Sequence, residues 1–202
     1  MIACATVFDH PVKMESQKEL VGFLSEMTSY EMIEGNFKQT KSIKKLNRDF
    51  VSTGKFLIWN GVGIYWVTQK PFESFLQVND SGVAQWDDKG NKKEISTKEN
   101  PVFAEFSKTI WSVFSGNVKE MEKNFEVYFE KSAKNVSIGL VPRETAVRKV
   151  IANLVMEGSR NLEKVTITDG DGNLVVYEFS NHVLQKEFKM DPLYIYENMK
   201  GK

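Results

Sequence analysis

The strongest constraint on the fold of this chain is a series of short segments in which apolar and polar residues alternate. Turn sequences separate these segments, as at Asn60-Gly61-Val62-Gly63 and Asn79-Asp80-Ser81-Gly82. A period of two predicts strands, and connections this short can join only antiparallel neighbours. The predicted strands are residues 37–40, 50–59, 64–69, 72–78, 83–87, 93–97, 125–130, 136–141, 164–168, 174–179 and 183–188.

Helical patterns precede and interrupt the strands. Ser16 and Glu19 have the spacing of a capping box, which predicts a helix over residues 16–27. A second helix is predicted over residues 101–116, because a proline begins it, a glycine ends it and bulky apolar residues recur at helical spacing. Residues 144–156 also have helical periodicity, but they are rich in β-branched residues, so helix and part-strand both stay open.

These elements predict one α+β domain over residues 16–202, which is an ordinary size for a single core. Residues 1–15 are expected to form a disordered tail. Ala3-Cys4-Ala5 is similar to the end of a signal peptide, although no apolar segment precedes it, so a signal-peptide remnant and a plain tail both stay open. Two or three helices cannot cover so large a sheet, so we expect the sheet to curl on itself or to leave a cavity.

Several kinds of chemistry are not expected. Lys plus Arg and Asp plus Glu both total 27, which argues against a nucleic-acid binder. The two histidines, His10 and His182, accompany no nucleophile motif, and with one cysteine they predict neither catalysis nor a metal site. Residues 169–173 begin like a calcium loop, but Leu174 and Ser180 occupy the positions that need Gly and Glu, so a hairpin turn is the better interpretation. No cofactor is predicted.

Two groups of residues are candidates for binding. The first is basic, and it is either a solvated hairpin loop without a binding role or a patch for an acidic partner or anionic lipid. Its members are Lys38, Lys41, Lys44, Lys45 and Arg48. The second shares one strand parity and would line one face of the sheet as either a filled core or a cavity. Its members are Phe56, Ile58, Ile64, Trp66, Leu76 and Val78.

The sequence resembles the LolA family of periplasmic outer-membrane lipoprotein carriers. The resemblance begins with Gly35-Asn36-Phe37-Lys38-Gln39-Thr40 and continues through Gly54-Lys55-Phe56 and Tyr65-Trp66. It extends to Pro71-Phe72-Glu73-Ser74 and ends with the hairpin before Phe179-Ser180-Asn181. The order of elements fits the family over roughly residues 16–190.

The resemblance implies an incomplete β-barrel with helices as a lid over a hydrophobic cavity, in a monomer without cofactor. Its ligand would be the acyl chains of lipoproteins, received from an inner-membrane transporter and passed through the periplasm to an outer-membrane acceptor. Trp66 matches the family's cavity tryptophan. The lid would add Phe103, Phe106, Ile110 and Phe114, with Leu24 and Met27 from the first helix.

Asn60 departs from the family, because it stands where a basic gating residue is usual. The departure leaves room for another acylated cargo, such as a glycolipid. A lipid-sensing binding module of the same fold is a further alternative. A small hydrolase would need a nucleophile and a base, and the sequence supplies no recognisable pair.

Overall fold

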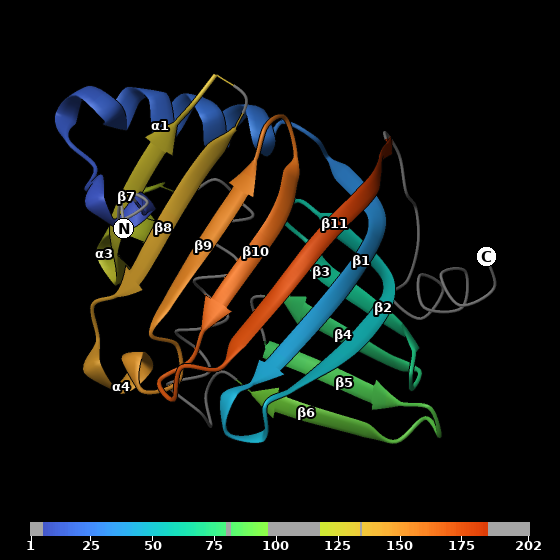
Figure 1. Ribbon diagram of the computed structural model, residues 1–202. Coiled ribbons are helices and arrows are strands. Elements are labelled where there is room, and N and C mark those ends of the chain that lie inside the picture. Colours follow the sequence, from blue (N-terminus) through green and yellow to red (C-terminus); the bar gives the residue numbers. More distant parts are fainter. Residues whose placement is uncertain (1–5, 80–81, 97–117, 134, 186–202) are drawn as a thin grey trace.

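The computed structural model describes residues 6–79, 82–96, 118–133 and 135–185, and its described strands form one large antiparallel sheet (Figure 1). The spatial order is β6-β5-β4-β3-β2-β1-β11-β10-β9-β8-β7, so β6 and β7 are the two edges and the sheet is not closed. The first six strands are β1 (Met32–Ile43), β2 (Arg48–Trp59), β3 (Gly63–Lys70), β4 (Ser74–Asn79), β5 (Gly82–Asp87) and β6 (Lys92–Ser96). The others are β7 (Phe125–Lys131), β8 (Val136–Pro142), β9 (Asn153–Gly158), β10 (Leu162–Thr168) and β11 (Leu174–Gln185).

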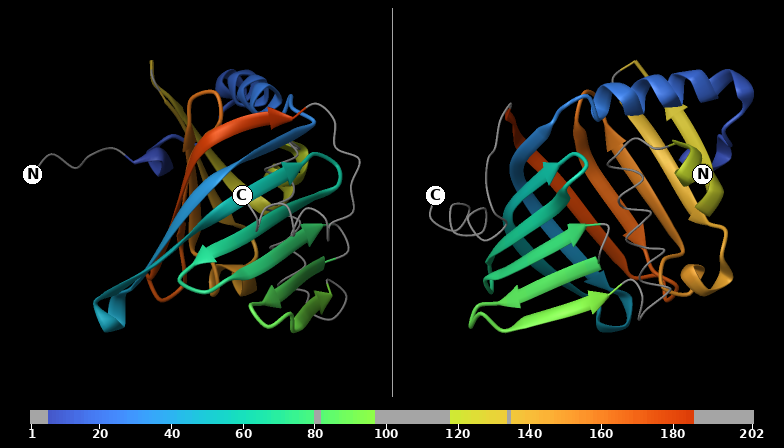
Figure 2. Two further views of the ribbon diagram at one scale, coloured as in Figure 1. Left: turned by 90° about the vertical axis from the view of Figure 1, so that its right-hand side faces the viewer. Right: turned by 180° about the vertical axis from the view of Figure 1, so that it is seen from behind.

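The sheet is strongly curved, which confirms the predicted curved antiparallel architecture. Seen from the side, β3 to β6 turn away from the plane of β9 to β11, and the two halves enclose a concave face (Figure 2). The halves are joined by the pairing of β1 with β11, in which Phe37 lies opposite Phe179. A bulge between Glu34 and Asn36 interrupts this ladder. Bulges increase local twist, so this one adds to the bend of the sheet.

Helix α1 (Met14–Met27) crosses the top of the sheet near the ends of β7 to β10 (Figure 1). It begins two residues before the predicted start. Ser16 lies inside the helix and not at its cap. The Ser16 Oγ accepts a hydrogen bond from the Lys13 N–H at 3.0 Å. Shorter helical segments are η1 (Val7–Asp9), η2 (Lys44–Leu46), α3 (Val118–Asn124) and α4 (Thr145–Arg148). The predicted helix over 101–116 lies outside the described residues.

The pattern over 144–156, for which helix and part-strand were both open, divides into the short helix α4 and the strand β9, and the burial of residues 153–158 alternates as in a strand. The part-strand interpretation is therefore confirmed. One further element differs from the sequence prediction. The predicted closing strand at 183–188 is not separate within the described residues, since β11 continues through Ser180 to Gln185. Asn181 adopts a positive φ of 54° at the bulge, a conformation that asparagine tolerates better than most residues, and the strand resumes after it.

The segment before α1 is also different from the expected tail. Residues 6–12 run along the edge strand β7, where Val12 N–H donates to the Val127 carbonyl at 3.0 Å. The Phe129 N–H donates in turn to the His10 carbonyl at 2.9 Å. Phe8 packs edge-on against Tyr128 with ring centroids 5.4 Å apart. These contacts satisfy backbone groups of a sheet edge that would otherwise be unpaired.

Apolar residues are buried on both faces of the sheet. The larger cluster lies on the concave face and draws on α1, α3, β1 to β5 and β7 to β11. A smaller cluster of Met32, Leu57, Tyr65, Val67 and Phe75 has the opposite parity on β1 to β4. The prediction of a single apolar face is therefore incomplete for this half of the sheet.

Candidate functional site

The candidate site is the concave face, where the structure brings together the six strand residues that the sequence predicted. Phe56, Ile58, Ile64 and Val78 are buried in the larger cluster, and Trp66 and Leu76 pack against it partly buried. Their strands pair in register, so that Phe56 lies opposite Trp66 and Trp66 lies opposite Leu76. The common parity deduced from the sequence therefore places all six on one surface.

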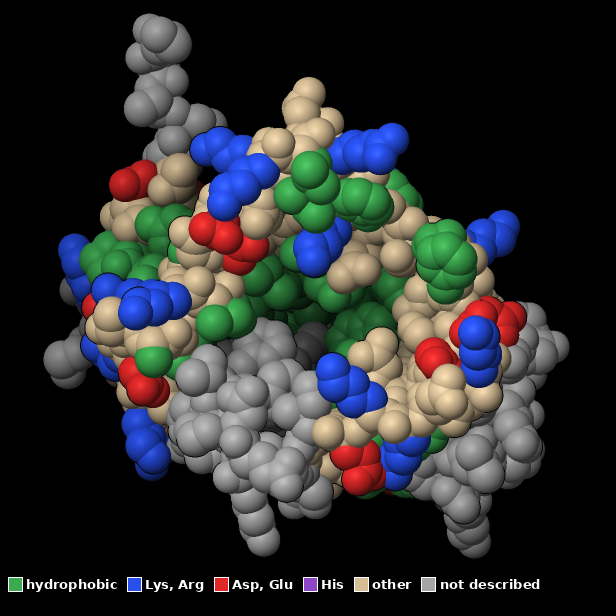
Figure 3. All heavy atoms as spheres, turned by 90° about the horizontal axis from the view of Figure 1, so that it is seen from below, with side chains coloured by type: hydrophobic (Ala, Val, Ile, Leu, Met, Phe, Trp, Pro, Cys, Tyr) green, Lys and Arg blue, Asp and Glu red, His purple; other side chains and the backbone are tan. Residues whose placement is uncertain are grey.

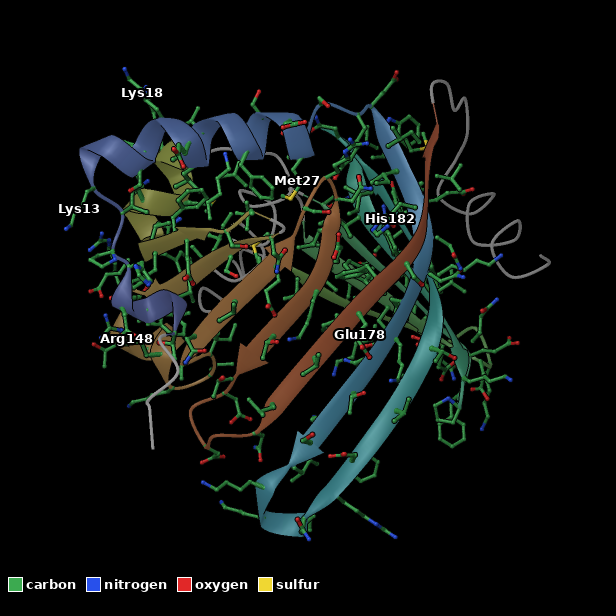
Figure 4. All side chains as sticks on the ribbon, turned by 45° about the horizontal axis from the view of Figure 1, so that its top comes forward. Lys13, Lys18, Met27, Arg148, Glu178 and His182 are labelled. Atoms are coloured by element: carbon green, nitrogen blue, oxygen red, sulfur yellow. The ribbon has the colours of Figure 1, made fainter. Side chains whose placement is uncertain are left out.

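The first helix contributes as predicted to the same surface. Leu24 and Met27 are buried in the concave cluster together with Leu20. Met27 ends α1 at the end of the sheet where His182 also lies, near the end of β11 (Figure 4). Gln17 links α1 to α3 by donating from Nε2 to Glu122 Oε1 at 3.0 Å. The predicted lid residues Phe103, Phe106, Ile110 and Phe114 lie outside the described residues, so their role stays a prediction.

An aromatic cluster occupies the centre of the concave face, and only two of its members, Phe56 and Trp66, were predicted from sequence. Phe37 and Tyr177 lie beside Trp66, with ring centroids 6.3 and 6.2 Å from it. Phe179 contacts Phe56 edge-on at 5.1 Å and stacks on Tyr177 at 6.2 Å. We call these five residues the aromatic cluster. Phe37, Tyr177 and Phe179 were missed because they meet across the β1–β11 pairing, which no local sequence signal predicts.

A small pocket opens beside the aromatic cluster, with a volume of about 10 Å³. That is roughly the space of one water molecule. Its wall is mainly apolar, and its two polar residues are Tyr30 and His182. The lining residues are Tyr30, Ile33, Phe56, Ile58, Leu162, Phe179 and His182.

Burial controls the ionisation of the polar groups in this pocket. It raises the pKa of Tyr30 to about 12, so the phenol stays neutral at physiological pH. It lowers the pKa of His182, against the opposing effects of the Leu162 carbonyl and Glu163. His182 Nε2 lies 2.9 Å from the Leu162 oxygen, and its ring meets Phe56 edge-on at 5.7 Å. The two polar groups of this mostly apolar pocket are thus kept in their neutral forms.

The described concave face opens toward the end of the sheet that is opposite α1. Seen from this end, the molecule is hollowed at its centre, and apolar side chains line the hollow (Figure 3). Charged side chains of both signs and further apolar side chains lie around the opening (Figure 3). A second cavity of about 240 Å³ lies between α3, β7, β8 and α4, and its lining includes Lys123, Arg143 and Glu144. The rest of its lining is Asn124, Phe125, Pro142 and Val147, so the wall is mixed in character.

Asn60, at the position of the expected gating residue, links the β2–β3 turn to the end of α1. Its backbone N–H donates to the Glu31 carbonyl at 2.9 Å, and its Nδ2 lies 3.4 Å from the Thr28 carbonyl. Gly61 follows with φ of +74°, so the turn needs a residue that accepts the left-handed region. In this chain a neutral, exposed amide therefore holds the segment between α1 and β1.

The segment compared with a calcium loop is a hairpin turn, as predicted. Asp169 Oδ1 accepts hydrogen bonds from the N–H groups of Asp171 and Asn173, and its Oδ2 accepts one from Asn173 Nδ2 at 2.8 Å. The carboxylate that would bind a cation thus stabilises the turn itself. Within the described residues, no group of three or more His, Cys, Asp or Glu side chains could hold a metal ion. None of the helices among them is long and apolar enough to cross a bilayer.

One protein family matches most of this chain in sequence. The sequence model of a family described as outer membrane lipoprotein carrier protein LolA matches residues 28–192. No curated protein sequence matches the chain significantly. The matched segment begins at the end of α1 and contains all of the strands given above.

Solved structures with a similar architecture have very different sequences. A DUF1329 family protein from Desulfovibrio piger superposes with a TM-score of 0.50 at 8% identity, over 87% of this chain and 94% of that one. A LolA superfamily protein from Nitrosomonas europaea has a TM-score of 0.46 at 7% identity, over 89% and 96% of the two chains. The Pseudomonas aeruginosa MucA/MucB complex gives 0.45 at 10% identity, over 82% of this chain and 56% of that one. At identities this low, the similarity shows only that the folds are alike.

Proposed function

The chain belongs to the LolA family, whose model matches residues 28–192, and from this premise we propose that it is a carrier of acylated cargo. The cargo would be the acyl chains of lipoproteins, bound on the concave face and shuttled through the periplasm toward the outer membrane. The carrier would act without a cofactor and without chemical conversion of its ligand. Its partners would be a transporter that loads it and an acceptor that empties it.

One observation carries this proposal, namely the continuous apolar surface on the concave face. It extends from Val83 on β5 through the aromatic cluster to Phe125 on β7, and α1 lies over one end of it. The opening at the other end is lined by apolar side chains (Figure 3). A hydrocarbon chain needs such a surface, and it needs few directional contacts.

The energetics of an acyl chain favour an escort. A chain of about 16 carbons gains roughly 12 kcal/mol on leaving water, at about 0.8 kcal/mol per CH₂ group. An acylated protein would therefore not cross an aqueous compartment alone. The carrier must nevertheless release its cargo, which favours a binding site that opens and closes over one that binds in a fixed form.

The pocket on the concave face must widen before it can take cargo. A space of about 10 Å³ cannot hold an acyl chain, so the side chains around Phe56 and Phe179 must move apart when cargo enters. We place this movement between α1 and the sheet, because α1 packs on the sheet through apolar side chains and not through a strand ladder. The predicted lid over residues 102–114 would extend this cover.

Asn60 supports a second candidate cargo on the same site. The basic residue usual at this position in the family is replaced by an amide that bonds to the backbone of Thr28. Hand-off of cargo could therefore follow a different trigger, which suits a glycolipid or another acylated molecule. In either case the acyl chains occupy the concave face.

Native mass spectrometry tests this proposal. The protein is mixed with a triacylated lipopeptide or with a glycolipid, and bound mass is measured for the parent chain and for Ile58→Trp, which fills the pocket. We expect one acylated ligand per chain on the parent protein and at least a tenfold weaker complex for Ile58→Trp.

The matched control is Val183→Trp, on the outer side of β11, where the side chain is 48% exposed. This variant should bind like the parent chain. Thermal unfolding of both variants separates loss of binding from loss of fold, since overpacking at Ile58 costs about 1–3 kcal/mol. A parent chain that binds neither ligand, or an Ile58→Trp variant that is folded and binds both normally, would contradict the proposal.

A further inference from the structure

The hairpin formed by β1, η2 and β2 projects beyond the end of the sheet that is opposite α1 (Figures 1 and 2). All eight residues from 44 to 51 at its tip are exposed. A hairpin tip that is not covered by other elements gains little stability from its own contacts. Its exposed side chains are therefore available for another role.

The exposed side chains of this tip are unusually apolar. Leu46 is 60% exposed, Phe50 47% and Val51 48%. Leu174, on the adjoining strand β11, is also largely exposed and lies opposite Ser42 in register. Single exposed apolar residues are ordinary, but several on one projecting tip indicate a surface that is covered in use.

Cations surround these apolar residues. Lys44, Lys45 and Arg48 lie at the tip with one acid, Asp49, so the local excess is two positive charges. These three cations make no ion pair within the described part of the chain, whereas Lys38, further along β1, pairs with Glu178 at 3.1 Å. The tip thus carries three exposed cations without an ion pair within the described residues.

The tip is also held in place. Asn47 adopts the left-handed conformation with φ of 46° and ends η2. The Lys44 N–H donates to Asn173 Oδ1 at 2.9 Å, and Asn173 is fixed in turn by Asp169. The apolar and basic side chains are thus presented on an anchored hairpin.

We propose that this hairpin docks on the surface of a bilayer that contains anionic lipid. Apolar side chains ringed by Lys and Arg match the boundary between acyl chains and negative headgroups. An acidic protein would attract the same cations, but it would not by itself explain the exposed Leu46, Phe50 and Val51. The hairpin projects at the end of the sheet opposite α1, so docking there would bring this end of the concave face close to the membrane (Figures 1 and 2).

Vesicle co-sedimentation tests this inference without acylated cargo, so its outcome is independent of the proposed carrier function. The full chain is mixed with vesicles of phosphatidylcholine alone or with phosphatidylglycerol added. We expect binding to the anionic vesicles, weaker binding at high salt and little binding to neutral vesicles. The double variant Lys44→Gln/Lys45→Gln should bind more than about tenfold more weakly, since each cation near an anionic surface contributes about fivefold.

Two more variants test the apolar and acidic residues. Leu46→Ser should weaken binding to anionic vesicles severalfold, and Asp49→Asn should strengthen it. The matched controls lie on α1 and at the residue that precedes it, at the other end of the molecule (Figure 4). They are Lys13→Gln/Lys18→Gln for charge and Val21→Ser for an exposed apolar residue, and both should bind like the parent chain.

Equal binding to neutral and anionic vesicles, or equal losses in the hairpin and α1 variants, would overturn the inference. So would a protein that binds no vesicle but requires Lys44 and Lys45 for transfer of cargo from a membrane transporter. That result would assign the hairpin to an acidic protein surface.

Discussion

Gln39 donates a hydrogen bond of 2.7 Å from Nε2 to the Tyr177 hydroxyl, across 138 positions of sequence. The bond joins β1 to β11, the pairing that holds the two halves of the sheet together. Burial raises the pKa of Tyr177 and this hydrogen bond opposes the shift. Tyr177 belongs to the aromatic cluster, so this hydrogen bond satisfies its hydroxyl group within largely apolar surroundings.

Tyr177→Phe should reduce the free energy of unfolding by about 1 kcal/mol, because the Gln39 amide then loses its partner. The double variant Gln39→Leu/Tyr177→Phe should recover most of this loss, since neither polar group is left. Denaturant unfolding of the two single variants and the double variant measures the coupling. Additive losses would show that the bond contributes nothing to the β1–β11 pairing.

Gly54 lies in β2 where the backbone of β3 approaches closely. A Cβ at this position would overlap the Val67 carbonyl oxygen. Gly54→Ala should therefore lower the free energy of unfolding by about 1–3 kcal/mol. Gly22→Ala is the matched control, because Gly22 is in α1 with open space around it, and there alanine should stabilise the helix by about 0.5–1 kcal/mol. Similar effects of the two variants on the melting temperature would refute this account of Gly54.

His182 should make stability depend on pH. Burial lowers its pKa in the folded protein below the ordinary value of 6.5. As pH falls below about 6.5, the unfolded chain takes up a proton that the folded chain accepts less readily, so stability decreases toward the lower folded pKa. At higher pH both states are neutral and the loss is absent.

Thermal unfolding between about pH 7.5 and pH 5.5 measures this dependence. His182→Gln keeps a donor for the Leu162 carbonyl and cannot titrate, so it should flatten the profile in this window. A variant profile as steep as that of the parent chain would assign the pH dependence to other groups.

The local hairpins of this fold could be predicted from sequence, but the long-range pairing could not. The turn at residues 169–173 and the parity of Phe56 and Ile58 are local signals, and the structure agrees with both. The β1–β11 pairing joins segments far apart in the chain, so Phe37 and Phe179 were not recognised as neighbours. Ile64 to Val67 did carry a usable signal, because a continuous apolar run predicts a strand buried on both faces.

The residues of the candidate site divide in the same way, into those that local sequence signals place together and those that only long-range pairing brings together. Trp66 and Val78 belong to one meander and could be placed on one surface by counting residues. Tyr30 and His182 come from opposite ends of the chain, and neither motif nor periodicity connects them. Their meeting depends on the long-range pairing of β1 with β11. The tip at Leu46 was predicted as a basic loop, but its apolar exposure follows only from the structure.

Photo-crosslinking with a diazirine fatty acid tests the central claim most directly, because it maps where an acyl chain lies. The account predicts labels on the concave face, at Ile33, Ile58 and Phe179, and their loss when an acylated lipopeptide competes. Labels confined to the outer cluster around Leu57 and Phe75, or a protein that takes no label, would contradict it.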